Sequence, residues 1–141
     1  MNILISACLL GQYCRYDGQT KVYPQVQALI GRDDIHLIPV CPEQCGGLAT
    51  PRPAAERQGS RVVTANGSEV TAQYQRGAEA ALYWARLFHC TKAILKEKSP
   101  SCGHGQIYDG TFSRTLTVGD GVTAALLRAE GLEIIGESDL P

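Results

Sequence analysis

The sequence lacks any feature that would place the protein in a membrane or send it across one. No apolar run approaches the length of a membrane span, and the N-terminal segment has no basic residues ahead of its apolar stretch. We therefore expect a cytoplasmic protein with no membrane partner. In a reducing compartment the six cysteines are better explained as metal ligands, catalytic thiols or buried residues than as a disulfide framework.

An excess of positive charge is also missing. The chain has 13 Lys and Arg residues against 14 Asp and Glu, a formal net charge of -1, and no cluster of basic residues. Binding to a nucleic-acid backbone requires a concentrated positive surface, so DNA, RNA and intact tRNA are disfavoured as partners. A ligand the size of a nucleotide remains compatible with this composition.

One pattern occurs three times: a short apolar run ends at or near a cysteine, and glycine follows within a few residues. The three pairs of run and cysteine are Asn2–Ala7 with Cys8, His36–Val40 with Cys41, and Lys92–Leu95 with Cys102. Ligands of an open parallel sheet bind in the crevice outside the carboxyl ends of the strands. If the runs are such strands, their cysteines converge, and a metal site explains them better than three unrelated buried thiols.

The segments between these runs alternate between helical and strand patterns. The predicted elements are helices over Lys21–Arg32, over Ala72–Cys90 behind a Thr71 cap, and after Gly121, a β-hairpin within Gln58–Thr71 that turns at Ala65–Ser68, and a last strand over Leu132–Gly136. This alternation predicts an α/β fold, here a three-layer Rossmann-like domain with a mainly parallel sheet and an inserted β-hairpin. Residues 1–141 are expected to form a single domain. Cys90, at the end of an apolar helix, is interpreted as a core thiol.

The second cysteine lies in the least ordinary stretch of the chain, C-P-E-Q-C-G-G at 41–47. Glu43 stands between the thiols of Cys41 and Cys45, where a metal or a proton must offset its charge. This makes Glu43 a general acid/base candidate, and a solvated surface glutamate is the alternative. Two prolines then hold Arg52 in an extended segment, either as an anion contact or as an ordinary surface charge.

The segment Gly119–Thr123 precedes a predicted helix and offers a candidate anion site. Free N–H groups in the first helical turn and the hydroxyl of Thr123 would bind a phosphate. The cations that could assist are Arg52, Lys96 and Lys98. A cap by Asp120 explains the same residues without a ligand and is the favoured interpretation from the residues alone.

Four motifs, in this order, resemble the DUF523 family. They are S-A-C-L-L-G with C-R-Y-D-G at 6–18, C-P-E with G-G-L-A-T-P-R at 41–52, K-E-K-S-P-S-C-G at 96–103 and G-V-T-A-A-L-L at 121–127. The resemblance covers essentially the whole chain. The characterised members of the family are thiouracil desulfidases of the TudS type.

The resemblance implies an oxygen-sensitive 4Fe-4S cluster, supplied by iron–sulfur assembly machinery, with one iron open to a substrate sulfur. By position, its ligands are Cys8, Cys41 and Cys102, with Cys14 and Cys45 as alternative ligands. Glu43 and Ser101 match polar residues that manage protons beside the open iron. The implied substrate is a thiolated uracil base or nucleotide (2-/4-thiouracil or 4-thio-UMP), which water converts to the oxo form with release of hydrosulfide. A phosphate site at Thr123 would favour the nucleotide.

Three other functions remain open. A zinc-binding protein would use the same thiols, although the C-x-x-C-like pairs typical of structural zinc are absent. A thiol-based redox or acyl-transfer enzyme would need a base beside an activated cysteine, and His36, His89 and His104 are not obviously paired with a thiol. A loop hydrogen bond is the favoured interpretation of His104. A non-catalytic nucleotide-binding module is the third alternative.

Overall fold

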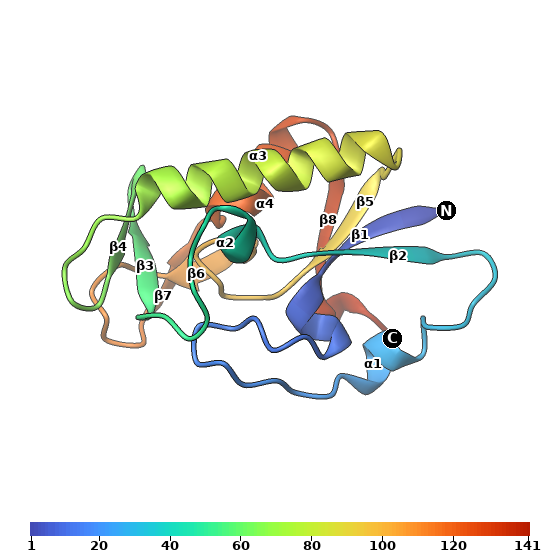
Figure 1. Cartoon of the computed structure of the whole chain (residues 1–141), viewed down its shortest axis with the longest axis horizontal. Helices are drawn as coiled ribbons and strands as arrows, with labels where there is room; N and C mark the ends of the chain where they lie inside the picture. Colours follow the sequence, from blue (N-terminus) through green and yellow to red (C-terminus); the bar gives the residue numbers. More distant parts are fainter.

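Four parallel strands form the central sheet of the protein, shown in Figure 1 as a computed structural model that describes residues 1–141. In spatial order they are β2 (His36–Val40), β1 (Asn2–Ser6), β5 (Lys92–Leu95) and β8 (Glu133–Gly136). Leu4 in β1 pairs with Ile38 on one side and with Ala93 on the other, and every neighbouring pair is parallel. The strand order therefore reverses beside β1, where open α/β sheets bind ligands. The predicted α/β class with a mainly parallel sheet is confirmed.

Helices cover both faces of the sheet and create the three layers. One face is covered by α3 (Thr71–Leu87) and α4 (Val122–Ala129), and the other by α1 (Pro24–Gln27) with two 3-10 helices, η1 (Ala7–Leu10) and η2 (Glu137–Asp139) (Figure 1). The second layer is thin because its helices are short. None of the helices combines the length and the apolar composition needed to cross a membrane.

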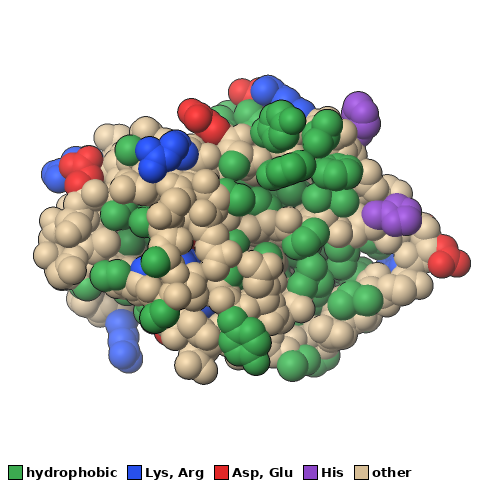
Figure 2. All heavy atoms as spheres, viewed as in Figure 1, with side chains coloured by type: hydrophobic (Ala, Val, Ile, Leu, Met, Phe, Trp, Pro, Cys, Tyr) green, Lys and Arg blue, Asp and Glu red, His purple; other side chains and the backbone are tan.

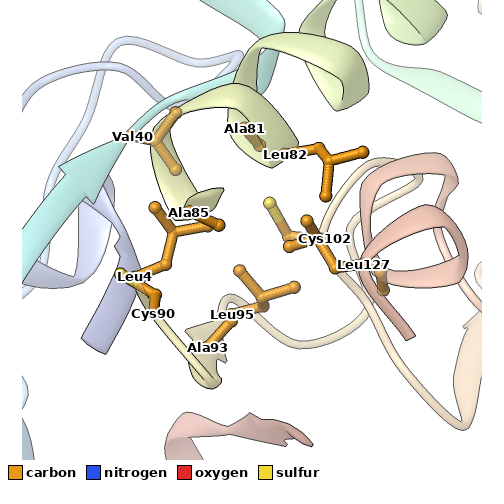
Figure 3. Packing of buried hydrophobic residues seen from close by; sticks show 11 residues of the cluster. Leu4, Val40, Ala81, Leu82, Ala85, Cys90, Ala93, Leu95, Cys102 and Leu127 are labelled. Atoms are coloured by element: carbon orange, nitrogen blue, oxygen red, sulfur yellow. The ribbon is translucent and has the colours of Figure 1, made fainter. Parts of the chain in front are cut away.

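The larger core lies between the sheet and its long helix. Leu4 and Leu95 from the sheet pack with Ala81 and Ala85 of α3 and with Leu127 of α4, and all five are buried (Figure 3). Small alanine side chains on α3 leave room for the leucines of the strands, so that the layers interdigitate at the density of a protein interior. The predicted alanine-rich face of this helix is the buried face.

The predicted helix over Lys21–Arg32 is wrong in its extent. Only Pro24–Gln27 is helical, and turns follow it. Proline is accepted in a first helical turn but would break a helix that began earlier, so the helix starts at this residue. Of the helix-spaced apolar residues, Val26 is fully buried whereas Val22 is 72% exposed. The apolar spacing therefore did not mark one buried helical face.

Two short hairpins lie beyond the carboxyl end of the sheet (Figure 1). They are β3 (Ala55–Gln58) with β4 (Arg61–Thr64), and β6 (Gln106–Tyr108) with β7 (Leu116–Val118), both antiparallel. The turn predicted at Ala65–Ser68 forms, because Val63 bridges Glu69 and the N–H of Val70 donates to the carbonyl oxygen of Val62 at 2.9 Å. The longer ladder of β4 is with β3, through a turn at Gly59 that was not predicted. The second hairpin was not predicted.

Neither predicted side-chain cap forms. The helix α3 starts at Thr71 itself, whose Oγ1 accepts a hydrogen bond from the N–H of Val62 at 2.9 Å. The helix α4 starts after Gly121 without a side-chain cap. The carboxylate of Asp120 instead accepts the N–H of Gly105 at 2.9 Å, which joins two loops rather than capping a helix.

Apolar side chains remain exposed on the outer face of α3. Tyr83, Trp84, Leu87 and Phe88 are all partly exposed, and Figure 2 shows hydrophobic side chains gathered over the C-terminal half of this helix. The rings of Trp84 and Phe88 stack on one another with centroids 6.2 Å apart. The N-terminal turns of α3 lie at the other end, beside β3 and β4 (Figure 1).

The short helix α2 (Pro42–Cys45) contacts α3 through backbone atoms at a distance that only glycine allows. A Cβ added at Gly46 would lie 1.9 Å from the carbonyl oxygen of Gln73, and one added at Gly77 would lie 1.9 Å from the carbonyl oxygen of Pro42. Because α2 follows β2 directly, this contact sets the position of the residues at the end of that strand.

The close contact between α2 and α3 leads to a stability prediction. Alanine in place of an interior helical glycine normally stabilises a helix, but Gly77→Ala should lower the free energy of unfolding by about 2 kcal/mol or more, because the two helices must separate. Urea denaturation measures the change. The matched control is Gln75→Ala on the exposed face of the same helix, which should be neutral. A Gly77→Ala protein as stable as the wild type would contradict the close contact.

Candidate active site

A cavity of about 530 Å³ opens at the carboxyl end of the sheet, where the strand order reverses. Its walls include Cys8 after β1, Cys41 after β2 and Cys102 beyond β5. The structure thus brings together the three thiols that the sequence pattern placed at strand ends. Residues of the two hairpins complete the walls. The volume falls in the range of about 300–1,000 Å³ that is typical of sites for small molecules.

Each thiol is positioned by the turn that follows its strand. Cys8 lies in η1, and Cys41 immediately precedes Pro42, the first residue of α2. The turn at Cys102 is closed by Ser99, whose Oγ accepts the N–H of Cys102 at 3.1 Å. Proline at the start of α2 and the side-chain hydrogen bond at Ser99 are local signals that fix where each strand stops.

A fourth thiol, Cys14, is buried between Cys8 and Cys41 and also lines the cavity. Its hydrogen bonds, first to Cys41 and then to Cys8, together with burial raise the pKa of Cys14 far above its usual value. The bond from Cys14 lowers the pKa of Cys41 to about 7, against burial. It also lowers the pKa of Cys8, where the charge of Lys96 adds to the effect. The Cys41 thiol also lies 3.8 Å from the carbonyl oxygen of Cys14, to which it can donate, so Cys14 supports both neighbouring cysteines.

Cys102 has a different environment. Its side chain is 3% exposed, and burial, followed by the charge of Glu43, raises the pKa of this thiol. A thiol in such a place becomes a thiolate only when positive charge is brought into the cavity. No three His, Cys, Asp or Glu side chains are arranged to hold a single metal ion. The sulfurs are distributed around the cavity wall.

The carboxylate of Glu43 is fixed through one of its two oxygens. Its Oε2 accepts hydrogen bonds from a guanidinium nitrogen of Arg52 at 3.0 Å and from the hydroxyl of Tyr74 at 3.1 Å. The side chains of Glu43 and Arg52 are 14% and 6% exposed, so the ion pair is largely removed from water. No side chain donates to Oε1, which leaves this oxygen as the one able to accept a proton from a molecule in the cavity.

Arg52 lines the cavity but its charge is already engaged. The guanidinium donates to Thr50 Oγ1 at 3.0 Å and to the carbonyl oxygen of Cys14 at 2.9 Å, in addition to Glu43. Although burial opposes it, the charge of Glu43 raises the pKa of Arg52, which stays protonated. Tyr74 stays protonated as well, because burial and the neighbouring Glu43 raise the pKa of its hydroxyl. Arg52 thus supports the carboxylate rather than offering a free cation.

Two lysines line the cavity in different states. Lys96 is half-buried, and its ammonium group pairs with Glu137 of η2 at 2.8 Å. Burial alone would lower the pKa of Lys96, but the hydrogen bond that its ammonium group donates to Glu137 raises it, so the cation persists beside Cys8. Lys98 is exposed at the mouth and has no ion-pair partner. Of the two, only Lys98 is free to meet an anionic group.

Ser101 and Thr123 are buried behind the cavity wall rather than on it. Their hydroxyls hydrogen bond to each other at 2.9 Å, and Ser101 Oγ lies 3.9 Å from the sulfur of Cys102. The first N–H groups of α4 donate to the carbonyl oxygens of Pro100, Ser101 and Gly103. The expectation of a phosphate site at Gly119–Thr123 is therefore wrong, because the loop before Cys102 already occupies the helix start.

The remaining candidates lie away from the cavity. Cys45 is exposed on α2 and does not line the cavity, so the structure does not support it as an alternative ligand. Cys90 is buried in the larger core, as predicted (Figure 3). His104 lies against Asp139 with Nε2 and Oδ2 3.4 Å apart, which is a loop contact of the predicted kind.

Sequence reasoning missed several residues of the cavity. Four aromatic and two basic side chains line it in addition to the predicted ones: Tyr16, Tyr74, Tyr108, Phe112, Arg15 and Arg114. Tyr74 follows the apolar spacing of α3 and is buried, so its pattern is that of a core residue. A signal was available for Arg15 and Tyr16, which directly follow Cys14. Nothing local marks Phe112 or Arg114, which belong to the hairpin that was not predicted.

Comparisons with known proteins agree over nearly the whole chain. A family model described as 2-thiouracil desulfurase matches residues 3–139. A protein of Bacillus subtilis (strain 168), described as uncharacterized protein YbbK, is 42% identical over an aligned length of 148, and the alignment covers 98% of this chain and 97% of the relative. A solved structure of the 4Fe-4S-dependent thiouracil desulfidase TudS (DUF523Vcz) superimposes with a TM-score of 0.92 at 50% identity, covering 99% of this chain and 93% of that one.

The thiol network leads to a prediction for the metal-free protein. Alkylation of Cys41 by iodoacetamide should rise as the pH passes upward through about 7, because the thiolate is the nucleophile. Cys45 is the internal control, since partial desolvation raises its pKa and its reaction should begin at higher pH. Cys14→Ala removes the main cause of the low pKa and should move the Cys41 profile upward. Mass spectrometry follows each site, and identical profiles for Cys41 and Cys45 would contradict the network.

Proposed function

The chain belongs to the 2-thiouracil desulfurase family, and we propose that it removes sulfur from thiolated uracil with the aid of a 4Fe-4S cluster. The observation that carries this proposal is the single cavity that joins the thiols of Cys8, Cys41 and Cys102 to the carboxylate of Glu43. The reaction consumes one water and converts a carbon–sulfur double bond to a carbon–oxygen double bond, with release of hydrosulfide and a proton. No electrons are gained or lost.

The residues present fit the cofactor. Iron–sulfur clusters are held by cysteine thiolates, and the three strand-end cysteines all line the same cavity. Cys8, Cys41 and Cys102 would hold it, and Cys14, whose thiol pKa is raised, would donate its one S–H hydrogen to a neighbouring ligand sulfur rather than serve as a ligand. A cluster with three protein ligands supplies one open iron that polarises the carbon–sulfur bond and accepts the sulfur. A single zinc ion fits less well, because three donors do not converge.

Residues of the chain activate the water and transfer the protons. Glu43 would take a proton from water through its free Oε1, while Arg52 and Tyr74 hold Oε2 and keep the carboxylate in place. The activated water adds to the base carbon that carries sulfur, and Glu43 can then return the proton to the departing sulfur or to the ring.

Ser101 was expected to share this proton transfer, and its position points to another role. Its hydroxyl is buried, bonded to Thr123, and close to the sulfur of Cys102. We assign Ser101 as a positioning residue that orients Cys102. Thr123 supports Ser101, so neither residue is proposed to contact the substrate.

The substrate class is a thiolated uracil base or its nucleotide, and the cavity has the size for either. Arg15, Lys98 and Arg114 line the cavity and could meet an anionic group, in place of the helix start that is already occupied. A net charge of -1 offers no broad positive surface, so intact nucleic acid is not proposed as a substrate.

The wider setting follows from the cofactor. A cluster enzyme depends on iron–sulfur assembly machinery as a partner. All six cysteines are free thiols, which suits a reducing compartment such as the cytoplasm. The cavity is lined by residues from Ser6 to Arg114, and we therefore propose that residues 1–141 act as one domain.

The ligand assignment predicts the iron content of variants. Protein purified without oxygen should be brown, with about four irons and four sulfides per chain. Cys8→Ala, Cys41→Ala and Cys102→Ala should each lose iron, since each removes a thiolate ligand. Cys90→Ala and Cys45→Ala are the controls and should retain iron. Metal and sulfide analysis provides the measurement.

Two further results bear on the same assignment. Cys14→Ser should retain iron, because a hydroxyl can still donate a hydrogen bond to a neighbouring sulfur. If Cys14 were a ligand, the same variant would lose iron. Ser101→Ala should bind iron less firmly than the Cys45→Ala control. Stoichiometric zinc without iron in carefully anaerobic protein would overturn the cluster proposal.

The role of the carboxylate predicts the kinetics of its variants. Glu43→Gln should retain the cluster and lower kcat for 4-thiouracil about 100-fold or more, because it removes the base. Tyr74→Phe should lower kcat about tenfold, since one of two hydrogen bonds to Oε2 remains. Tyr83→Phe, on the exposed face of α3, is the matched control. Near-normal turnover by Glu43→Gln would show that another group activates the water.

A further inference from the structure

Aromatic side chains are scarce in this chain but concentrated at one place. The sequence contains six Tyr, two Phe and one Trp. Of these nine, Tyr16, Tyr74, Tyr108 and Phe112 line the cavity at the end of the sheet. Tyr74 is committed to Glu43 by its hydroxyl, whereas Phe112 has no polar group and no structural partner of this kind.

Phe112 is placed at the cavity in an unusual way for an apolar residue. It lies in the loop between β6 and β7, is 37% exposed, and adopts a left-handed backbone conformation with φ of 57°. A bulky residue pays a steric penalty in this conformation. Its side chain belongs to none of the core clusters and lines the cavity instead. An aromatic ring held at the edge of a cavity is suited to cover a flat ligand.

A buried carboxylate holds the loop that carries Phe112 through hydrogen bonds to its backbone. Glu56 of β3 is 9% exposed and lines the same cavity. Its Oε1 accepts the N–H of Gly110 at 3.0 Å and the N–H of Phe112 at 3.1 Å. No Lys or Arg forms an ion pair with Glu56. Backbone N–H groups therefore provide the hydrogen bonds that a buried carboxylate requires.

Gly110 brings the base of the loop into close contact with the β3–β4 hairpin. Its φ is 91°, and an added Cβ would lie 2.7 Å from Cγ of Gln58 and 2.9 Å from the carbonyl oxygen of Arg57. The amide of Gln58 also donates to the carbonyl oxygen of Gly110 at 2.8 Å. The base of the loop is thus fixed to the β3–β4 hairpin at both its N–H and its carbonyl group, while the ring of Phe112 remains partly exposed.

We propose that Phe112 is the aromatic cover of the substrate base and that Glu56 is the positioning residue that holds it over the cavity. The inference rests on the proposed function, because it takes the ligand to be a planar pyrimidine. Stacking on an aromatic ring acts on the whole face of the base and does not depend on the sulfur. Phe112 therefore binds substrate and product alike, and contributes to affinity rather than to the chemical step.

The test compares Phe112→Leu with Phe88→Leu. Phe88 is a matched control because it is 38% exposed and directly follows α3, away from the cavity. Phe112→Leu should raise KM for 4-thiouracil and the Kd for uracil, measured by calorimetry, by about 5- to 30-fold, with kcat changed less than about twofold. Phe112→Tyr should restore both constants, and iron content should match the wild type throughout. Uracil has no sulfur, so its titration is independent of turnover.

The roles of Glu56 and Gly110 are tested by comparing their variants with Phe112→Leu, singly and in combination. Glu56→Ala and Gly110→Ala should each raise the Kd for uracil nearly as much as Phe112→Leu, and Glu56→Gln should stay close to the wild type because it keeps an acceptor oxygen. Adding Phe112→Leu to Gly110→Ala should cause little further loss, since both act through the same ring. A fold defect alone would instead add to the loss from Phe112→Leu.

Several outcomes would overturn the inference. If Phe112→Leu behaves like Phe88→Leu, or if it lowers kcat and leaves affinity unchanged, the ring of Phe112 does not bind the base. Additive effects of Gly110→Ala and Phe112→Leu, or a loss in Glu56→Gln as large as in Glu56→Ala, would remove Glu56 as the positioning residue. Normal uracil binding without desulfuration by the wild-type protein would contradict the proposed function and leave the aromatic cover supported.

Discussion

The central strand of the parallel sheet is the constraint on which the site depends. β1 forms hydrogen-bonded ladders with β2 on one side and with β5 on the other. The loops after these three strands must therefore all leave the sheet at its carboxyl end, and each loop carries a cysteine of the cavity. A one-residue slip in register would turn each side chain to the other face of the sheet. The geometry of the thiols is thus a property of the backbone pairing.

Charge compensation around the cavity follows from its burial. Glu43 is paired with Arg52, and Glu137 is paired with Lys96. A buried charge without a partner would be strongly destabilising. The pairs leave one carboxylate oxygen unbound by side chains and one ammonium group beside a thiolate, which are the groups that a sulfur-removing reaction can use.

The errors of sequence reasoning share a physical origin. The polar residues Ser101 and Thr123 stand in motifs that look catalytic, but packing turned their hydroxyls toward each other. Asp120 stands at the start of a helix, but a neighbouring loop takes its carboxylate. In each case a local pattern allows several hydrogen-bond partners of similar energy, and a contact distant in the sequence selects among them.

The sequence by itself determined the strands of the central sheet, the alternation with helices and the three strand-end cysteines, because periodicity and glycine or proline stops are local properties. Its motifs also identified the family. Only the tertiary structure decided that Tyr74 and Arg52 share one oxygen of Glu43, that Cys14 joins Cys8 and Cys41 at the cavity, and that Phe112 reaches it. These facts depend on how separate elements pack, through contacts such as that between α2 and α3, and no local pattern encodes such a distance.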